Sequence, residues 1–158
     1  MSLDPDDFRA LLGRFASGVT VVTTVGSQGH DVGMTVSAFC SVSLDPPLVL
    51  VCIAKDATAY RAFESTPTLA INVLAASQEA LSRRFAGAVA DRFDGIGYER
   101  AKNGAALLHD VLAWMEGAID ARHEAGDHLI LVVRVTHGAV ADHRPLLYYR
   151  GGYGQLDH

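Results

Sequence analysis

The sequence predicts a single, mainly β domain with flanking helices, in which the strands form an antiparallel barrel. Its 158 residues, 49% hydrophobic and 20% charged, have the size and composition of one folded domain covering residues 1–158. Six or seven segments are β-branched or alternate between apolar and polar residues. Most of these segments are separated by short turns and not by helices. This order favours hairpins and a closed barrel over β-α-β units.

The first part of the chain reads as a helix followed by a hairpin. Residues 4–18 begin with Asp-Pro, repeat apolar residues at helical spacing and reach a glycine, which together predict a helix. Residues 19–25 are β-branched and predict a strand, and the Gly-Ser-Gln-Gly sequence at 26–29 predicts a turn. The stretch 33–47 then forms the second arm of this hairpin.

The middle of the chain alternates strands with short helices. Residues 48–54, after two prolines, are apolar on both faces and predict a central, fully covered strand. A short helix follows, on which Tyr60 and Phe63 share a face. Residues 68–74 predict another strand, and a second helix starts near Ser77.

The last part contains a long connection and three more strands. Residues 87–108 have no period and predict a connection with at most a brief helical turn. Residues 114–123 alternate as a strand does, although their apolar spacing also suits a helix. Residues 129–135 and 145–149 predict the final strands, before a glycine-rich tail.

Composition excludes several classes of protein. The net charge of −5 argues against nucleic acid as a partner. No apolar run approaches the roughly 20 residues that span a bilayer, and the acidic N-terminus does not resemble a signal peptide. Cys40 and Cys52 have no CxxC spacing, so we expect buried, reduced thiols and a cytoplasmic location.

The common nucleotide-binding and nucleophile motifs are absent. The nearest approach to a Rossmann turn starts at Gly95, but Arg100 stands at the position of its third glycine and no strand precedes it. The sequence also lacks a P-loop and a GxSxG elbow. A Rossmann or P-loop nucleotide enzyme is therefore excluded.

The stretch 33–47, GMTVSAFCSVSLDPP, is the strongest candidate for a ligand-binding wall. It carries small hydroxyl residues, among them Thr35, Ser37 and Ser41, inside an apolar frame. Small side chains let a flat polar ligand approach the backbone. An edge strand that runs into an ordinary turn remains the alternative.

Charged and hydroxyl residues near strand ends are further candidates for binding a ligand. Lys55, Thr58, Arg83 and Arg84 flank predicted helices and suit phosphate, although each also suits a solvated surface. Tyr153 and its tyrosine neighbours next to two glycines are able to stack on a ring or to pack in the core.

The Gly126-Asp127-His128 turn places a histidine at the start of a strand, where it either contacts a polar ring or lies on the surface. With His123 and Glu124 it gives four potential metal ligands in six residues. No second cluster supports them, so we expect no metal site.

Several motifs in this order resemble the flavin reductase-like family, which has the FMN-binding split-barrel fold. They are GMTVSAFCSVSLDPPLVLVCI, INVL, SRRFA, GDH and PLLYYRGGYG, and the likeness extends from Phe8 to Gly154. The resemblance implies a six-stranded antiparallel split barrel and a homodimer. It also implies an NAD(P)H-dependent reductase that supplies reduced FMN or FAD to a separate monooxygenase, with NADH or NADPH as co-substrate.

The resemblance also implies roles for individual residues. His128 would contact the nicotinamide as the catalytic-site residue. The flavin would be held by Thr35, Val36, Ser37, Ala38, Ser41, Ile53, Ala54, Lys55, Thr58, Arg83, Phe85, Ala86 and Tyr153. The alternatives are a flavin-bound oxidase of the pyridoxamine-phosphate-oxidase-like type and a non-catalytic flavin- or haem-binding protein.

Overall fold

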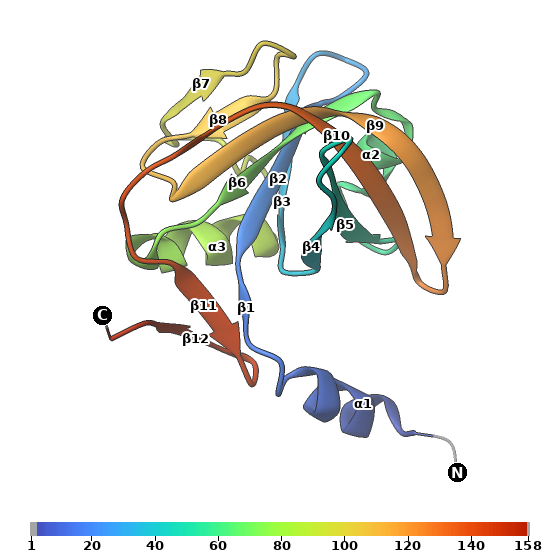
Figure 1. Ribbon diagram of the computed structural model, residues 1–158, viewed down its shortest axis with the longest axis vertical. Coiled ribbons are helices and arrows are strands. Elements are labelled where there is room, and N and C mark those ends of the chain that lie inside the picture. Colours follow the sequence, from blue (N-terminus) through green and yellow to red (C-terminus); the bar gives the residue numbers. More distant parts are fainter. Residues whose placement is uncertain (1–2, 158) are drawn as a thin grey trace.

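A curved antiparallel sheet forms the body of the protein in the computed structural model, which describes residues 3–157 (Figure 1). Its strands lie in the order β3-β2-β6-β9-β10-β5-β4. Their bounds are β2 (Thr20–Val25), β3 (Asp31–Val36), β4 (Phe39–Ser43), β5 (Leu48–Ala54), β6 (Thr68–Val73), β9 (Ala113–Ala125) and β10 (His128–Val140). The long β9–β10 hairpin crosses the whole body, as Figure 1 shows.

The two edge strands of this sheet, β3 and β4, are halves of one stretch of chain. Only Ser37 and Ala38 separate them. Because β3 pairs with β2 and β4 pairs with β5, this stretch joins both edges of the sheet and closes it. The result is a closed barrel of six strands when β3 and β4 are counted as one interrupted strand. This confirms the predicted antiparallel split barrel.

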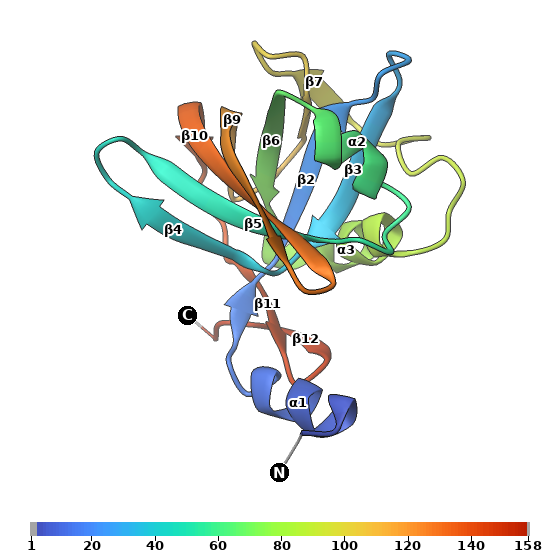
Figure 2. The same cartoon turned by 90° about the vertical axis from the view of Figure 1, so that its right-hand side faces the viewer.

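Smaller elements surround the barrel. A second sheet, in the order β1-β11-β12, lies below it and leads to the N-terminal helix (Figure 2). The bounds are α1 (Pro5–Leu12), β1 (Ser17–Gly18), α2 (Tyr60–Ser65), η1 (Ala76–Gln78), α3 (Glu79–Ala86), β7 (Tyr98–Arg100), β8 (Ala106–Leu108), β11 (Leu146–Tyr149) and β12 (Gly152–Gln155). Within residues 3–157, no helix combines the length and the apolar character needed to cross a membrane.

The structure corrects four predictions about these elements. The first helix ends at Leu12 and not near Gly18, because Gly13 caps it by donating its N–H to the Arg9 carbonyl (2.8 Å). The connection over 87–108 contains the β7–β8 hairpin, and the glycine-rich tail contains β12. The strand over 48–54 is only half covered, since its outward face is partly exposed.

Three apolar clusters hold the fold together, and the smallest of them contains Leu107 and three alanines. The barrel core includes Val51, Ile53, Phe63 and Leu131, all fully buried. A second cluster joins Phe85 of α3 to Val21 of β2. Fully burying one such side chain contributes roughly 1.5–3 kcal/mol, so the closed barrel depends on these contacts.

Gly117 of β9 gives a test of the barrel geometry. A Cβ atom at this position would lie 2.2 Å from the Arg134 carbonyl oxygen of β10, which is backbone and cannot move aside. We expect Gly117→Ala to lower the free energy of unfolding by about 3 kcal/mol in chemical denaturation. Gly18→Ala is the control, because its Cβ would meet nothing within 4 Å. Equal stability of the two variants would contradict this account of the β9–β10 contact.

Candidate functional site

The break between β3 and β4 leaves a short piece of backbone outside the sheet. Ser37 and Ala38 belong to neither strand, and both are exposed. The Ala38 carbonyl accepts a hydrogen bond from the Cys52 N–H of β5 (3.0 Å), which fixes the break against the neighbouring strand. β3 contacts β5, but in the described residues no ladder joins them. The barrel is therefore split beside these two small residues.

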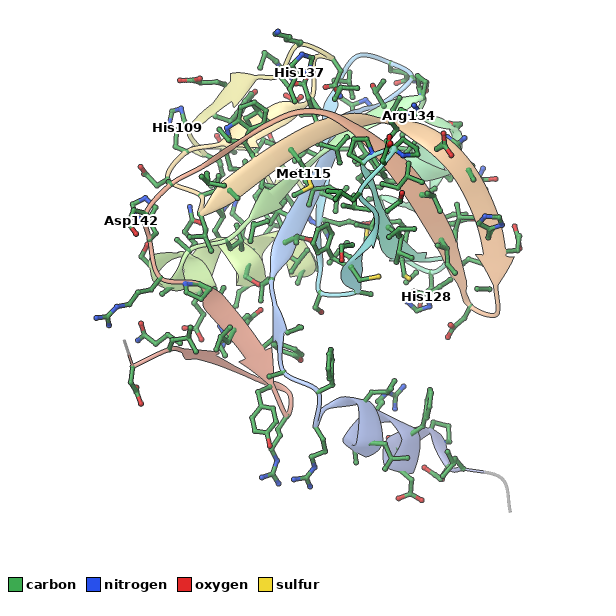
Figure 3. All side chains as sticks on the ribbon, in the orientation of Figure 1. His109, Met115, His128, Arg134, His137 and Asp142 are labelled. Atoms are coloured by element: carbon green, nitrogen blue, oxygen red, sulfur yellow. The ribbon has the colours of Figure 1, made fainter. Side chains whose placement is uncertain are left out.

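The end of β5 and the Gly126-Asp127-His128 turn lie next to each other. Ala54 is the ladder partner of His128, and the Lys55 N–H donates to the Asp127 carbonyl (2.9 Å). The Lys55 ammonium pairs with Glu124 of β9. Figure 3 shows His128 at the tip of the β9–β10 hairpin, away from His109 and Asp142 at the other side of the molecule.

Hydrogen bonding fixes the charges around this turn. His128 Nδ1 lies 2.7 Å from Asp127 Oδ1, and this contact lowers the pKa of the Asp127 carboxyl. The hydrogen bond to Glu124 raises the pKa of Lys55. With Nδ1 engaged by Asp127, the His128 ring has Nε2 available for a ligand.

A chain of hydroxyl contacts connects the break to α3 and the C-terminal hairpin. Thr35 Oγ1 donates to the Ser82 carbonyl (2.7 Å), and Ser82 Oγ lies 2.7 Å from the Tyr153 hydroxyl. The Arg83 guanidinium stacks over the Tyr153 ring, 4.9 Å from its centroid, and also reaches Glu79 at 3.3 Å. Ser82 was missed among the candidate residues, although it begins the SRRFA motif.

Three candidate residues are buried in the structure. Val36, Ile53 and Phe85 are 4%, 0% and 0% exposed. The Phe85 ring packs edge-on against Phe93, with centroids 5.0 Å apart. By contrast, Ser41, Thr58, Arg83 and Ala86 are exposed, and Ala54, Lys55 and Tyr153 are partly exposed.

Two expectations about side chains fail. Arg84 is not free for phosphate, because its guanidinium donates to the carbonyls of Asp91, Arg92 and Asp94 at 2.7–2.9 Å. Cys40 is exposed and not buried, whereas Cys52 is partly buried and its pKa is raised by that burial. Residues 3–157 contain no group of three histidine, cysteine or acidic residues placed to hold a metal ion.

A cavity that the sequence did not predict lies at the start of β3 and before α2. It has a volume of about 810 Å³ and is lined by residues 29–33, 58–59 and 89–96, with Tyr98. Thr58 is the one candidate residue of the described chain that lines it. Thr58 therefore links the candidate residues to this cavity.

The fold and this surface define a small split-barrel protein. The chain belongs to the flavin reductase-like domain family, whose model matches residues 12–157. It is 42% identical over 150 residues to stachydrine N-demethylase reductase subunit Stc3 of Rhizobium meliloti (strain 1021), covering 95% of this chain and 65% of that protein. It is 37% identical over 157 residues to HsaB of Rhodococcus jostii (strain RHA1), a flavin-dependent monooxygenase reductase subunit. This match covers 99% of this chain and 80% of that subunit.

Solved structures give the same result. One of them is the NADH:FAD oxidoreductase SgcE6 of Streptomyces globisporus C-1027, in complex with NAD and FAD fragments. Its TM-score to this chain is 0.91 at 37% sequence identity, and the match covers 99% of this chain and 96% of that one. Some relatives are longer. The chain spans 48% of another Rhizobium meliloti relative that is 43% identical.

The contact between Ser82 and Tyr153 leads to a prediction about stability. Ser82 is fully buried, so removing its hydroxyl partner leaves a polar group without its hydrogen bond. We expect Tyr153→Phe to lower the free energy of unfolding by about 1 kcal/mol in chemical denaturation. Tyr149→Phe is the matched control, since Tyr149 is 46% exposed. A loss no larger than that of the control would show that the contact does not stabilise the fold.

Proposed function

We propose that this chain is an NADH-dependent flavin reductase, which transfers hydride from NADH to FMN or FAD and supplies reduced flavin to a separate monooxygenase. Family membership and the names of the relatives support the proposal. The observation that carries it is the break at Ser37 and Ala38, where exposed backbone and small side chains face a split in the barrel. This surface fits a flat ring that must lie against backbone.

The residues around the break have separable roles in this proposal. The backbone of residues 35–38 supports the ring, and N–H groups there stabilise the negative charge that develops on reduction. Lys55, Thr58 and Arg83 hold the phosphate end. A bound flavin supplies the hydride-accepting ring, and the chain aligns the two partners.

His128 positions the nicotinamide in this proposal. Asp127 fixes its Nδ1, so the ring presents Nε2 in a defined direction beside the end of β5. Hydride transfer needs alignment more than a proton-transferring group. This explains how a surface without paired carboxylates supports a redox reaction.

The proposed function is tested by NADH oxidation in the presence of FMN, FAD or riboflavin. We expect turnover with at least one flavin, and no turnover with any would refute the proposal. Oxygen uptake with an organic substrate and without NADH would instead indicate an oxidase. Tight flavin binding without NADH oxidation would indicate a carrier.

His128→Ala tests the role of the turn. We expect the KM for NADH to rise about tenfold while the KM for flavin changes less than about twofold, because the lost contact is to the nicotinamide. His143→Ala is the control, since His143 is exposed and lies next to Asp142, across the molecule from His128. A larger effect on flavin than on NADH would remove His128 from this role.

We further propose that the chain acts as a homodimer. None of the residues of α1 is buried, and its apolar side chains have no cover in a single chain. The exposed fractions are 49% for Phe8, 59% for Leu11, 58% for Leu12 and 84% for the adjoining Phe15. Apolar surface of this kind favours burial against a second copy. The cytoplasmic location inferred from the sequence stays a prediction.

Sedimentation velocity tests the dimer. We expect the native chain to sediment as a dimer and Leu11→Glu to shift it toward the monomer, since a buried charge at the interface is unfavourable. Arg14→Glu is the control, because this exposed residue also changes charge but removes no apolar contact. A native monomer, or equal behaviour of both variants, would contradict the role of α1.

A further inference from the structure

The two cysteines of the chain lie on neighbouring strands beside the break. Cys40 belongs to β4 and Cys52 to β5, and these strands pair antiparallel at one edge of the sheet. Figure 2 shows the β4–β5 hairpin (teal) projecting from one side of the barrel. Both cysteines are free thiols, and the proposed function uses neither of them.

Both thiols belong to the outer face of the barrel. Phe39, Val51 and Ile53 pack in the barrel core. Because side chains alternate along a strand, the neighbouring residues Cys40 and Cys52 face outward. Cys40 is exposed and Cys52 is partly exposed. An oxidant in the solvent therefore reaches Cys40 first.

The ladder register makes the two cysteines diagonal neighbours. Cys40 pairs with Leu50, which is two residues before Cys52. The Cys52 N–H donates to the carbonyl of Ala38, which is two residues before Cys40. Diagonal neighbours on one face of a sheet lie about 7–8 Å apart between Cα atoms, and their side chains approach more closely. The two thiols also influence each other, since burial raises the pKa of Cys52 and Cys40 raises it further.

Strand β4 has the freedom to bring the thiols within bonding distance. A disulfide joins Cα atoms about 4.4–6.8 Å apart, slightly closer than a diagonal pair. In residues 3–157, β4 pairs with β5 and with no other strand, and this ladder is irregular between Ser41 and Ser43. A small shift of β4 therefore closes the gap. The resulting bond is strained, and strained disulfides are easily reduced again.

The same shift reaches the break. Ala38 is held against β5 by the Cys52 N–H (3.0 Å), and the Phe39 N–H donates to the Ser37 carbonyl (2.9 Å). Only Phe39 separates Ala38 from Cys40, so a movement of Cys40 toward Cys52 displaces the backbone of the break. That backbone is the surface on which the proposed function places the flavin ring.

The proposed function also generates an oxidant beside these thiols. Free reduced flavin reacts with O2 and gives oxidised flavin and hydrogen peroxide. A reductase that releases reduced flavin therefore produces peroxide whenever no oxygenase takes up the flavin. The exposed Cys40 thiol lies two residues from the surface that the flavin leaves.

We propose that hydrogen peroxide oxidises Cys40 and Cys52 to a reversible disulfide, and that this bond displaces the break at Ala38 and weakens flavin binding. The inference rests on the proposed function, since the peroxide comes from released flavin and the break is the flavin surface. The disulfide then slows the production of reduced flavin that no oxygenase consumes.

The oxidation proceeds in two steps. The Cys40 thiolate attacks one peroxide oxygen, so an S–O bond forms, the O–O bond breaks and the leaving hydroxide takes up the thiol proton as water. The Cys52 sulfur then attacks the Cys40 sulfur, so the S–S bond forms, the S–O bond breaks and a second water leaves with the Cys52 proton. The two sulfurs lose two electrons, and the peroxide gains them.

The first test detects the disulfide without any flavin. The full chain is reduced, treated with an equimolar amount of hydrogen peroxide, alkylated with N-ethylmaleimide and weighed by intact mass spectrometry. We expect the chain to lose two hydrogen atoms and to take up no maleimide. Peptide mapping is expected to show Cys40 linked to Cys52.

The matched control carries Cys40→Ser together with Ala139→Cys, which keeps two thiols but moves the exposed one. Ala139 is exposed and lies far along β10 from Ile130, the ladder partner of Cys52. It lines a separate cavity of about 360 Å³ with Trp114 and Val140. We expect this variant to form no internal disulfide under the same treatment.

The second test measures FMN binding by flavin fluorescence before and after oxidation. We expect oxidation to weaken FMN binding at least about fivefold and dithiothreitol to restore it. Cys40→Ser is expected to bind FMN equally before and after the treatment. During turnover with NADH and FMN in air, the disulfide is expected to accumulate without catalase and not in its presence.

A native chain that keeps both thiols free, or a control variant that forms the bond equally, would overturn the proposal. An oxidised chain with unchanged FMN affinity would overturn it as well. Failure of the proposed function gives a different result, because no flavin is then reduced while added peroxide still links Cys40 to Cys52. Since Cys40 is exposed, Cys40→Ser keeps the fold and the comparison stays valid.

Discussion

The whole structure depends on one constraint: a single stretch of chain, residues 31–43, has to pair with both edges of the same sheet. Its first half pairs with β2 and its second half with β5. No strand can do both without a change of direction, and that change falls at Ser37 and Ala38. Closure of the barrel thus requires a break, and the break leaves backbone exposed beside a split. The feature that stabilises the fold also creates the candidate site.

Three separate elements are fixed relative to this break. The Asp127-His128 turn is tied to the end of β5 through the Lys55 N–H. Helix α3 is tied to β3 through Thr35, and β12 is tied to α3 through Tyr153. Each connection is a hydrogen bond within or next to the barrel, so the elements hold their positions without a ligand. Such preorganisation suits a reaction that depends on alignment, because the binding energy need not order the site.

Local sequence patterns predicted the elements that depend on residue periodicity. They did not predict the elements that depend on contacts between residues distant in the chain. The β-branched run over 19–25 and the alternation over 114–123 predicted β2 and β9, and the turn chemistry predicted their hairpins. The β7–β8 hairpin was missed because it is held by contacts such as Tyr98 with Asp31, 67 residues apart. Arg83 and Arg84 are equivalent in the sequence, yet one is exposed beside Tyr153 and the other holds a loop. The cavity was invisible for the same reason, since its walls come from three distant segments.

We propose that flavin binds at the break formed by Ser37 and Ala38. Hydrogen–deuterium exchange with and without saturating FMN measures this directly, because backbone N–H groups that a ligand covers exchange more slowly. We expect slower exchange in peptides covering residues 33–40 and 52–58. Exchange that slows only around residues 107–114 and 139–143, which line the second cavity on the other side of the barrel, would contradict it, as would no change at all.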